Sequence, residues 1–260
     1  MFVGLAMAGL GFAFIANSQE PAPPAFEKAA DQAKADTEES ELFDSDQDRP
    51  VQAQVQVEFV EMGHEALTKL LFLAKPASSD ATKLREQVKD MVSRNEAKVL
   101  ETQIAIARSG QKATSESIHE FIYPTEYEPP ELTAGNVVPK NPPPWSPGPT
   151  PTAFETRNVG STLEIEPTIG TDNRIIDLRF VPELVWHTGS VTWHEGKDQL
   201  GNPFHVRMPD FYTLRLNTAL TLVSGQYALA GALSPKDDKG ETDMTRKVMV
   251  FVKCDVLVVK

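Results

Sequence analysis

The residues of this sequence that could carry chemistry are few. Of its five histidines, His187 and His194 are close enough in the chain to serve one site. Glu183 and Glu195 flank them, and imidazole together with carboxylate is a ligand set that zinc accepts. Their spacing matches no helical ligand pair, and Gly63-His64-Glu65 lacks the second histidine that a zinc-protease motif requires. We therefore expect polar loop positions here, with no metal, no cofactor and no enzymatic activity.

The single cysteine excludes a disulfide framework and a cysteine-rich zinc site. Cys254 falls on the apolar positions of an alternating run, so we expect a buried small side chain and not a reactive thiol. The 37 acidic and 25 basic residues give a net charge of −12, which argues against a nucleic-acid partner. A chain of 260 residues with 40% hydrophobic residues can build a sizeable core.

The first 50 residues differ in composition from the rest. Residues 1–16 are apolar and uncharged, and Ala16 and Ser18 are small residues before a possible cleavage site. This pattern predicts a secretory signal peptide at 1–18. Residues 19–50 carry ten acidic and three basic residues with few large apolar ones. Such a segment buries too little surface to offset its ordering entropy, so we predict an acidic disordered tether at 19–50.

The elements that must position any site begin at Val51. Apolar residues alternate with glutamines over 51–59, which predicts a half-buried strand. Helical spacing of apolar residues predicts helices over 65–73 and 81–94, and Asp80 is the expected N-cap of the second. A core domain over 51–260 therefore opens with one strand and two helices.

Two strands are expected next, over 97–107 and 113–121. Ser109-Gly110-Gln111 is a turn sequence that predicts a hairpin between them. Residues 124–151 then contain ten of the 20 prolines. Proline donates no backbone hydrogen bond, so we predict a stiff, extended loop there, a Pro-rich insertion at 124–153.

The second half of the chain reads as all-β. Alternating apolar residues predict strands over 163–169, 176–180, 212–222, 227–233 and 248–258. The expected fold class is therefore α+β, mainly β in the second half, with long antiparallel strands and two helices near the start.

One segment carries a more specific signal than the alternation of apolar residues. Val159, Gly160, Leu163 and Pro167 follow a V-G-x-x-L-x-V-x-P spacing. Other motifs stand around it in a fixed order: an alternating run ending in Glu61, a turn with Gly110 and Gln111, a strand ending at Pro124, the pair Asn217 and Thr218, and Gly225 and Gln226 followed by Gly231. Over residues 51–259 this series resembles the core domain of the bacterial secretins, the outer-membrane channel proteins of type II and type III secretion and type IV pilus systems.

The resemblance implies a secretin-like core whose long strands form part of an oligomeric β-barrel wall. It implies a subunit of a homo-oligomeric ring or channel in protein secretion or pilus-type transport. Secretion-system ring proteins and exported protein cargo are the implied partners, and the outer membrane or periplasm is the implied location. The glycines of the motifs are expected at turns or bends, and Pro167 at a strand end or edge.

Alternatives stay open at this point. Secretins carry an apolar stretch before the last strand, whereas Ser234–Thr245 is short and charged, and charge is costly in hydrocarbon. The alternative is a soluble periplasmic scaffold or binding module that kept the secretin core fold without forming a membrane pore. An exported enzyme that uses the region of His187 and His194 is a third interpretation. Trp186 and Trp193 fit either ordinary packing at strand ends or an aromatic girdle at a membrane.

Overall fold

The computed structural model describes residues 50–74, 78–128, 148–197 and 201–259. The chain divides into two units, Met1–Asp48 and Arg49–Lys260, and all the described residues belong to the second. The predicted signal peptide and residues 19–49 of the predicted tether lie outside the described residues. None of the described helices is long and apolar enough to cross a membrane.

The described strands form two antiparallel sheets. The four-stranded sheet has the order β2-β1-β9-β8. It is built from β1 (Val51–Gly63), β2 (Ala97–Arg108), β8 (Tyr227–Leu233) and β9 (Arg246–Val258). The five-stranded sheet has the order β3-β4-β5-β6, and β7 also pairs with β5. It is built from β3 (Ala113–Glu128), β4 (Thr150–Ile169), β5 (Ile175–Lys197), β6 (Pro203–Arg215) and β7 (Thr218–Val223). The predicted α+β class with long antiparallel strands is confirmed.

The main core lies between the two sheets. Val55 and Val57 of β1 are completely buried there, as are Leu163 and Ile165 of β4. These residues occupy alternate positions of their strands, so each sheet has one apolar face. Cys254 of β9 belongs to the same core, and burial raises the pKa of its thiol to about 12. The prediction of a buried, small side chain at this position is confirmed.

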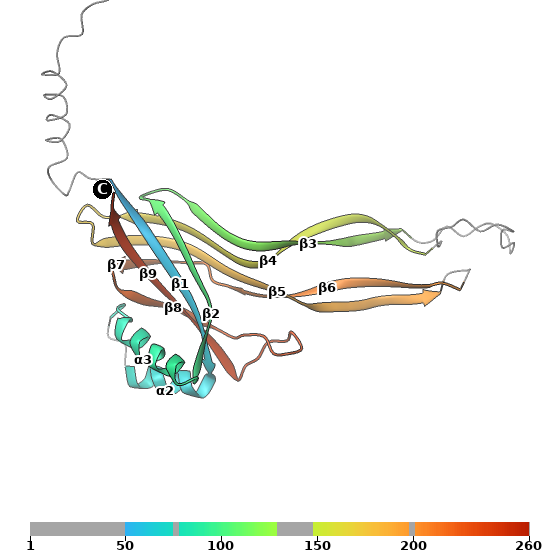
Figure 1. The fold of residues 1–260 in the computed structure, drawn as a ribbon, viewed down its shortest axis with the longest axis horizontal. Helices are drawn as coiled ribbons and strands as arrows, with labels where there is room; N and C mark the ends of the chain where they lie inside the picture. The colour runs from blue at the N-terminus through green and yellow to red at the C-terminus, as the bar shows by residue number, and fades with distance from the viewer. Residues whose placement is uncertain (1–49, 75–77, 129–147, 198–200, 260) are drawn as a thin grey trace, which may run out of the picture. The chain divides into compact units, whose positions relative to one another are not determined.

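A second core lies on the other face of the four-stranded sheet, where α2 (His64–Ala74) and α3 (Thr82–Ser93) pack (Figure 1). Leu84 and Val88 of α3 are buried against Phe251 of β9. The Asp80 carboxylate accepts the N–H of Thr82, the first residue of α3, at 2.9 Å. The N-cap position itself is held by Ala81, so the predicted N-cap at Asp80 is one residue too early. The two helices therefore cover one face of this sheet, and the five-stranded sheet covers the other.

The predicted hairpin at 109–111 is wrong. β2 and β3 follow one another in the chain but lie in different sheets. Ser109 Oγ accepts the N–H of Ile169 at 2.9 Å, and the Gly110 N–H donates to the carbonyl of Pro167 at 2.7 Å. Because both bonds attach the turn to the end of β4, the chain passes from the first sheet to the second. Spacing alone does not distinguish such a crossing from a hairpin.

The prediction of a loop over the whole of 124–153 is also wrong at both ends. β3 continues to Glu128, β4 begins at Thr150, and Pro124 and Pro151 both lie within the paired strands. Proline fits there because β3 is an edge strand, and β4 pairs with β5 only from Gly160 onward. Among the described residues, each of these prolines therefore has a neighbouring strand on one side only. Residues 129–147, the middle of the Pro-rich segment, lie outside the described residues.

The expected strand over 212–222 is divided into β6 and β7, and both pair with the same edge of β5. Pro182 of β5 lies opposite the break between them, where its carbonyl accepts the N–H of Leu216 at 3.2 Å. Proline has no N–H to return, so the ladder is interrupted at this point. The alternation of apolar residues continues across the break, so the sequence pattern alone predicts one strand.

Candidate subunit interface

The five-stranded sheet ends in two long strands whose outer edges are unpaired in the part of the chain that the structure describes. β3 has 16 residues and β6 has 13. A row of free N–H and C=O groups along an edge strand readily pairs with another strand. The two edges of this sheet are therefore candidate contact surfaces for a second chain.

The edge at β8, in the other sheet, is protected. β8 has seven residues, and the start of α3 lies against it. The Ala81 N–H donates to the carbonyl of Tyr227 at 2.7 Å, and the Tyr227 N–H donates to Thr82 Oγ1 at 3.2 Å. A head-to-tail contact in which the sheet of one copy continues into the sheet of the next uses both edges of that sheet. Since α3 covers part of the β8 edge, the five-stranded sheet is the one that offers two open edges.

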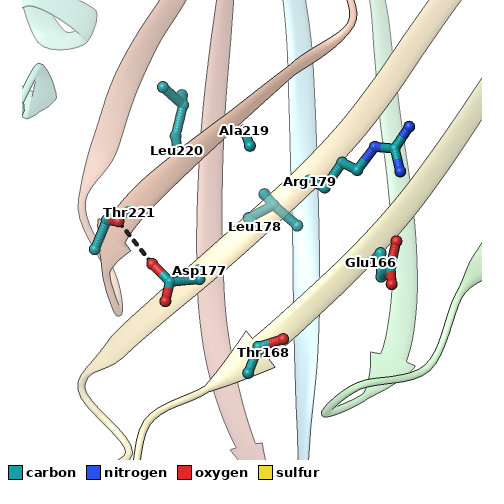
Figure 2. A pocket seen from close by; sticks show the side chains of 8 residues that line it. All are labelled: Glu166, Thr168, Asp177, Leu178, Arg179, Ala219, Leu220 and Thr221. Atoms are coloured by element: carbon teal, nitrogen blue, oxygen red, sulfur yellow. Dashed lines mark hydrogen bonds between the residues drawn. The ribbon is translucent and has the colours of Figure 1, made fainter.

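The two faces of the five-stranded sheet differ. Leu178 points toward the core side, whereas its neighbours Asp177 and Arg179 lie on the outer face (Figure 2). Asp177 accepts the hydroxyl of Thr221 at 2.6 Å, and the strand register places Glu166 opposite Arg179. These side chains line a depression on the outer face. The sheet is thus apolar toward the core and polar outside, as its alternating sequence predicts.

β4 and β5 separate at Gly160, which pairs with Val185 as the last pair of their ladder. Gly160 has a φ of +133°, and a Cβ atom at this position would lie 2.2 Å from the carbonyl oxygen of Ser117. A side chain therefore cannot fit without moving β3. The expectation that Gly160 stands at a bend where a side chain is costly is confirmed.

Beyond this point the β3–β4 and β5–β6 hairpins continue past the main core (Figure 1). Aromatic side chains join them. The rings of Phe121 and His187 stack with centroids 4.6 Å apart, and Phe211 lies edge-on to Phe121 at 5.7 Å. Tyr123 also contacts Phe211 at 5.7 Å. The two hairpins are therefore held together by side chains where their backbones no longer pair.

A charged group lies beside this aromatic cluster. Arg157 of β4 donates to Glu183 of β5 at 3.4 Å and to Thr213 Oγ1 of β6 at 3.1 Å. Arg215 lies 3.9 Å from the same Glu183 carboxylate. Sequence reasoning missed Arg157, although it stands three residues before Gly160. The only signal was a charged residue in a strand that is otherwise short of bases.

The residues considered as a metal site lie within β5, so the expected polar loop over this region is wrong, and they do not come together in one place. His187 contacts Phe121 and Phe211, whereas His194 contacts Phe204 with ring centroids 5.4 Å apart. No group of three or more metal-binding side chains occurs within the described ranges. Trp186 packs against the main core, as one of the two interpretations expected. Trp193 is 73% exposed, so ordinary packing does not account for it.

Two further glycines of the motif series occupy positions that favour glycine. Gly110 and Gly225 have φ values of +72° and +87° in tight turns. Gln111 and Gln226 follow them, and each donates its N–H back across its turn at 3.1 Å. Gly231 stands at an irregularity in the pairing of β8 with β9.

The remaining motif residues lie in strands or at their ends. Leu163 is in the main core, Val159 lies just before the bend, and Asn217 and Thr218 mark the start of β7. Pro167 pairs with Leu178 of β5 but lies beyond Ile165, the partner of the first β3 residue, so it stands at an edge on that side, as expected. Glu61 of β1 forms an ion pair with Arg246 of β9. These positions shape the turns, bends and strand ends of the fold and do not line one pocket.

The molecule thus belongs to the class of α+β proteins with two stacked antiparallel sheets, one of which has no strand beyond either edge in the described part of the chain. No protein-family model and no curated protein match the sequence. The structure is similar to GspD, a type II secretion system secretin of E. coli K12, with a TM-score of 0.37 and 13% sequence identity. That match covers 88% of this chain and 54% of GspD.

Two other secretins show a comparable similarity. The Salmonella SPI-1 type III secretion injectisome secretin InvG has a TM-score of 0.37 and 10% identity, over 89% of this chain and 71% of InvG. The type II secretion system secretin XcpQ of Pseudomonas aeruginosa has a TM-score of 0.40 and 12% identity, over 88% of this chain and 64% of XcpQ. This chain therefore spans about half of GspD and about two thirds of the other two. The solved structures belong to the family that the sequence motifs resemble.

Proposed function

We propose that this chain is a subunit of a homo-oligomeric ring in the bacterial envelope, with a role in protein secretion or pilus-type transport. The observation that carries the proposal is the five-stranded sheet with both long edges, β3 and β6, unpaired among the described residues. Pairing of β3 in one copy with β6 in the next is a head-to-tail contact, which produces a ring when the rotation closes. A closed ring of strands leaves no edge exposed.

The motif series supports the same function, because its members stand in the order found in secretins. They lie in strands and turns of both sheets. The proposed role is structural, without enzymatic activity. In such a ring, the β3–β4 and β5–β6 hairpins of every copy would extend side by side. Export through a cleaved signal peptide, location in the outer membrane or periplasm, and contact with secretion-system ring proteins and exported protein cargo belong to this proposal.

The β3 edge gives a direct test. A Cβ on Gly160 would meet the carbonyl oxygen of Ser117, so that carbonyl points toward β4. Backbone groups alternate in direction along a strand, and the N–H groups of Glu116 and Glu120 therefore point to the open side. Proline at these two positions removes donors from the outer edge and leaves the β3–β4 ladder intact.

We expect the full chain carrying E116P and E120P to remain folded but to lose the ring, as measured by particle mass in mild detergent. The matched control carries E116A and E120A, which removes the same two carboxylates and keeps both N–H groups. The control is expected to assemble like the wild type. A proline variant that forms particles of wild-type mass would overturn the proposed edge contact.

A second candidate function rests on the segment Ser234–Thr245. In secretins the corresponding stretch is apolar, whereas here it is charged and its carboxylates bind backbone N–H groups of the same loop. This observation favours a soluble periplasmic scaffold or binding module with a secretin-like core. A chain that stays monomeric at every concentration, with and without detergent, would support this function in place of the ring.

A further inference from the structure

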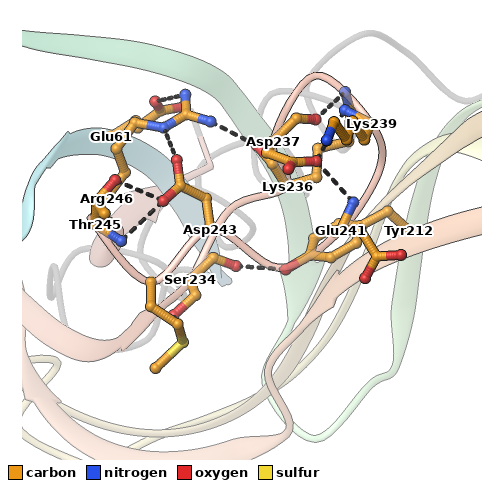
Figure 3. Close-up of polar contacts among 11 residues, drawn as sticks. Glu61, Tyr212, Ser234, Lys236, Asp237, Lys239, Glu241, Asp243, Thr245 and Arg246 are labelled. Carbon is orange, nitrogen blue, oxygen red and sulfur yellow. Dashed lines mark hydrogen bonds and ion pairs between the residues drawn. The ribbon is translucent and has the colours of Figure 1, made fainter.

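The loop between β8 and β9, residues 234–245, is tightly organised by its own acidic residues (Figure 3). Asp237 Oδ1 accepts the N–H groups of Lys239 and Glu241, each at 2.8 Å. Asp243 Oδ1 accepts the N–H of Thr245 at 2.8 Å and its hydroxyl at 2.6 Å. These hydrogen bonds within the loop give it a defined shape of its own.

One end of the loop is attached to the four-stranded sheet. Arg246, the first residue of β9, donates to the carboxylates of Glu61 and Asp243 and, at 2.6 Å, to the carbonyl of Lys236. The His64 N–H at the start of α2 donates to the carbonyl of Thr245 at 2.8 Å. The guanidinium of Arg246 thus joins β1, β9 and both ends of the loop (Figure 3).

The other side of the loop contacts the β5–β6 hairpin. Tyr212 of β6 donates its hydroxyl to the carbonyl of Ser234 at 2.8 Å. Gly240 lies so close to Thr188 of β5 that a Cβ on it would stand 2.6 Å from the Thr188 Cβ. The Thr188 hydroxyl is shielded from solvent at this contact. Both contacts lie just beyond the point where β5 leaves β4, at Val185.

We propose that residues 234–245 act as a strut, which sets the direction of the β5–β6 hairpin relative to the four-stranded sheet and its helices. Beyond Val185, β5 is paired with β6 alone within the described ranges. The β5–β6 ladder is irregular at Gly189, which has a φ of +147° and open space where a Cβ atom would stand. The hairpin could therefore bend at this position. The strut contacts it on both strands, one residue before Gly189 and at Tyr212. The inference does not depend on ring formation.

The test is a distance distribution between spin labels at K69C on α2 and R207C on β6. Both sites are exposed, and the natural Cys254 is completely buried and so inaccessible to the label. Labelled full-length chain is diluted with unlabelled chain, so that only distances within one copy are recorded. The variant R246Q/Y212F removes the two main attachments of the strut, and R94Q, which breaks the exposed Arg94–Glu96 pair at the end of α3, is the control.

We expect a narrow distribution in the wild type and in R94Q, and a distribution about twofold wider in R246Q/Y212F, because the hairpin has lost its lateral support. Should R246Q prevent folding, Y212F alone decides, since it removes one hydroxyl and keeps the ring beside Trp186. A smaller but measurable broadening is expected there. An unchanged distribution in the folded variants would overturn the proposed strut.

Discussion

Gly160 stands where the β3–β4 and β5–β6 hairpins separate, and the path of both hairpins depends on it. Its φ of +133° and the 2.2 Å approach of a built Cβ to Ser117 leave no room for a side chain. We expect G160A to reduce the free energy of unfolding by about 3 kcal/mol, from backbone strain plus overpacking. Urea denaturation measures this change.

Gly63 provides the matched control for this substitution. It ends β1, and a Cβ there meets no atom within 4 Å. G63A is expected to change the free energy of unfolding by less than about 0.5 kcal/mol. If G160A were as stable as G63A, the account of the bend would be wrong.

The lowered pKa of Asp243 predicts that the stability contributed by the strut depends on pH. Hydrogen bonds from Thr245, followed by those from Arg246, lower the pKa of its carboxyl to about 2 from its ordinary value of 3.8. A carboxylate with a lowered pKa adds stability above the unfolded-state value, and this stability is lost as the pH falls through the folded-state value. We expect the Tm difference between the wild type and D243N to be largest above pH 4 and to shrink between pH 4 and 2. A difference independent of pH over this range would contradict that role.

Among the elements, α3 has a specific attachment to the sheet. Glu58 of β1 is 4% exposed, and its carboxylate accepts Arg85 Nε at 2.6 Å and the Tyr227 hydroxyl at 3.2 Å. Burial, with the charge of Glu58, raises the pKa of Tyr227, so its hydroxyl remains a donor. This network holds the helix whose first residues cover the β8 edge.

Substitution R85M tests the network. It leaves the buried Glu58 carboxylate without its cation, and we expect a loss of about 3 kcal/mol in the free energy of unfolding. Adding E58L should recover much of this loss, because the unpaired charge is then removed as well. Chemical denaturation of the two variants checks both steps. Equal stability of R85M and the wild type would show that the ion pair does not anchor α3.

The elements also show how far the sequence predicts this fold. Alternation and helical spacing identified β1, β9 and both helices, because alternate residues of each strand face the main core and the helices each bury one side. The helices also bury part of the other face of β1 and β9. The errors occur where the pairing partner decides the structure. The turn at 109–111 crosses between sheets because of hydrogen bonds to Ile169 and Pro167, and β6 separates from β7 because of Pro182 in another strand. Such partners are distant in the sequence and leave no local pattern.

The candidate interface was predictable only in part. The bend at Gly160 followed from a motif, because glycine is required where backbones approach closely. The contacts of Arg157 with Glu183 and of Phe121 with His187 were not predicted, since they join strands 26 and 66 positions apart in the chain. The free edges of β3 and β6 appear only once the order of the strands is known.

For the whole molecule, the central claim is that the five-stranded sheet continues from one copy to the next. The most direct measurement is the particle mass of the wild-type full chain, extracted from bacterial envelopes in mild detergent. We expect a particle of many copies, because both long edges of the sheet need a partner. A particle with the mass of a single chain, soluble without detergent, would contradict the ring and leave the soluble module as the function.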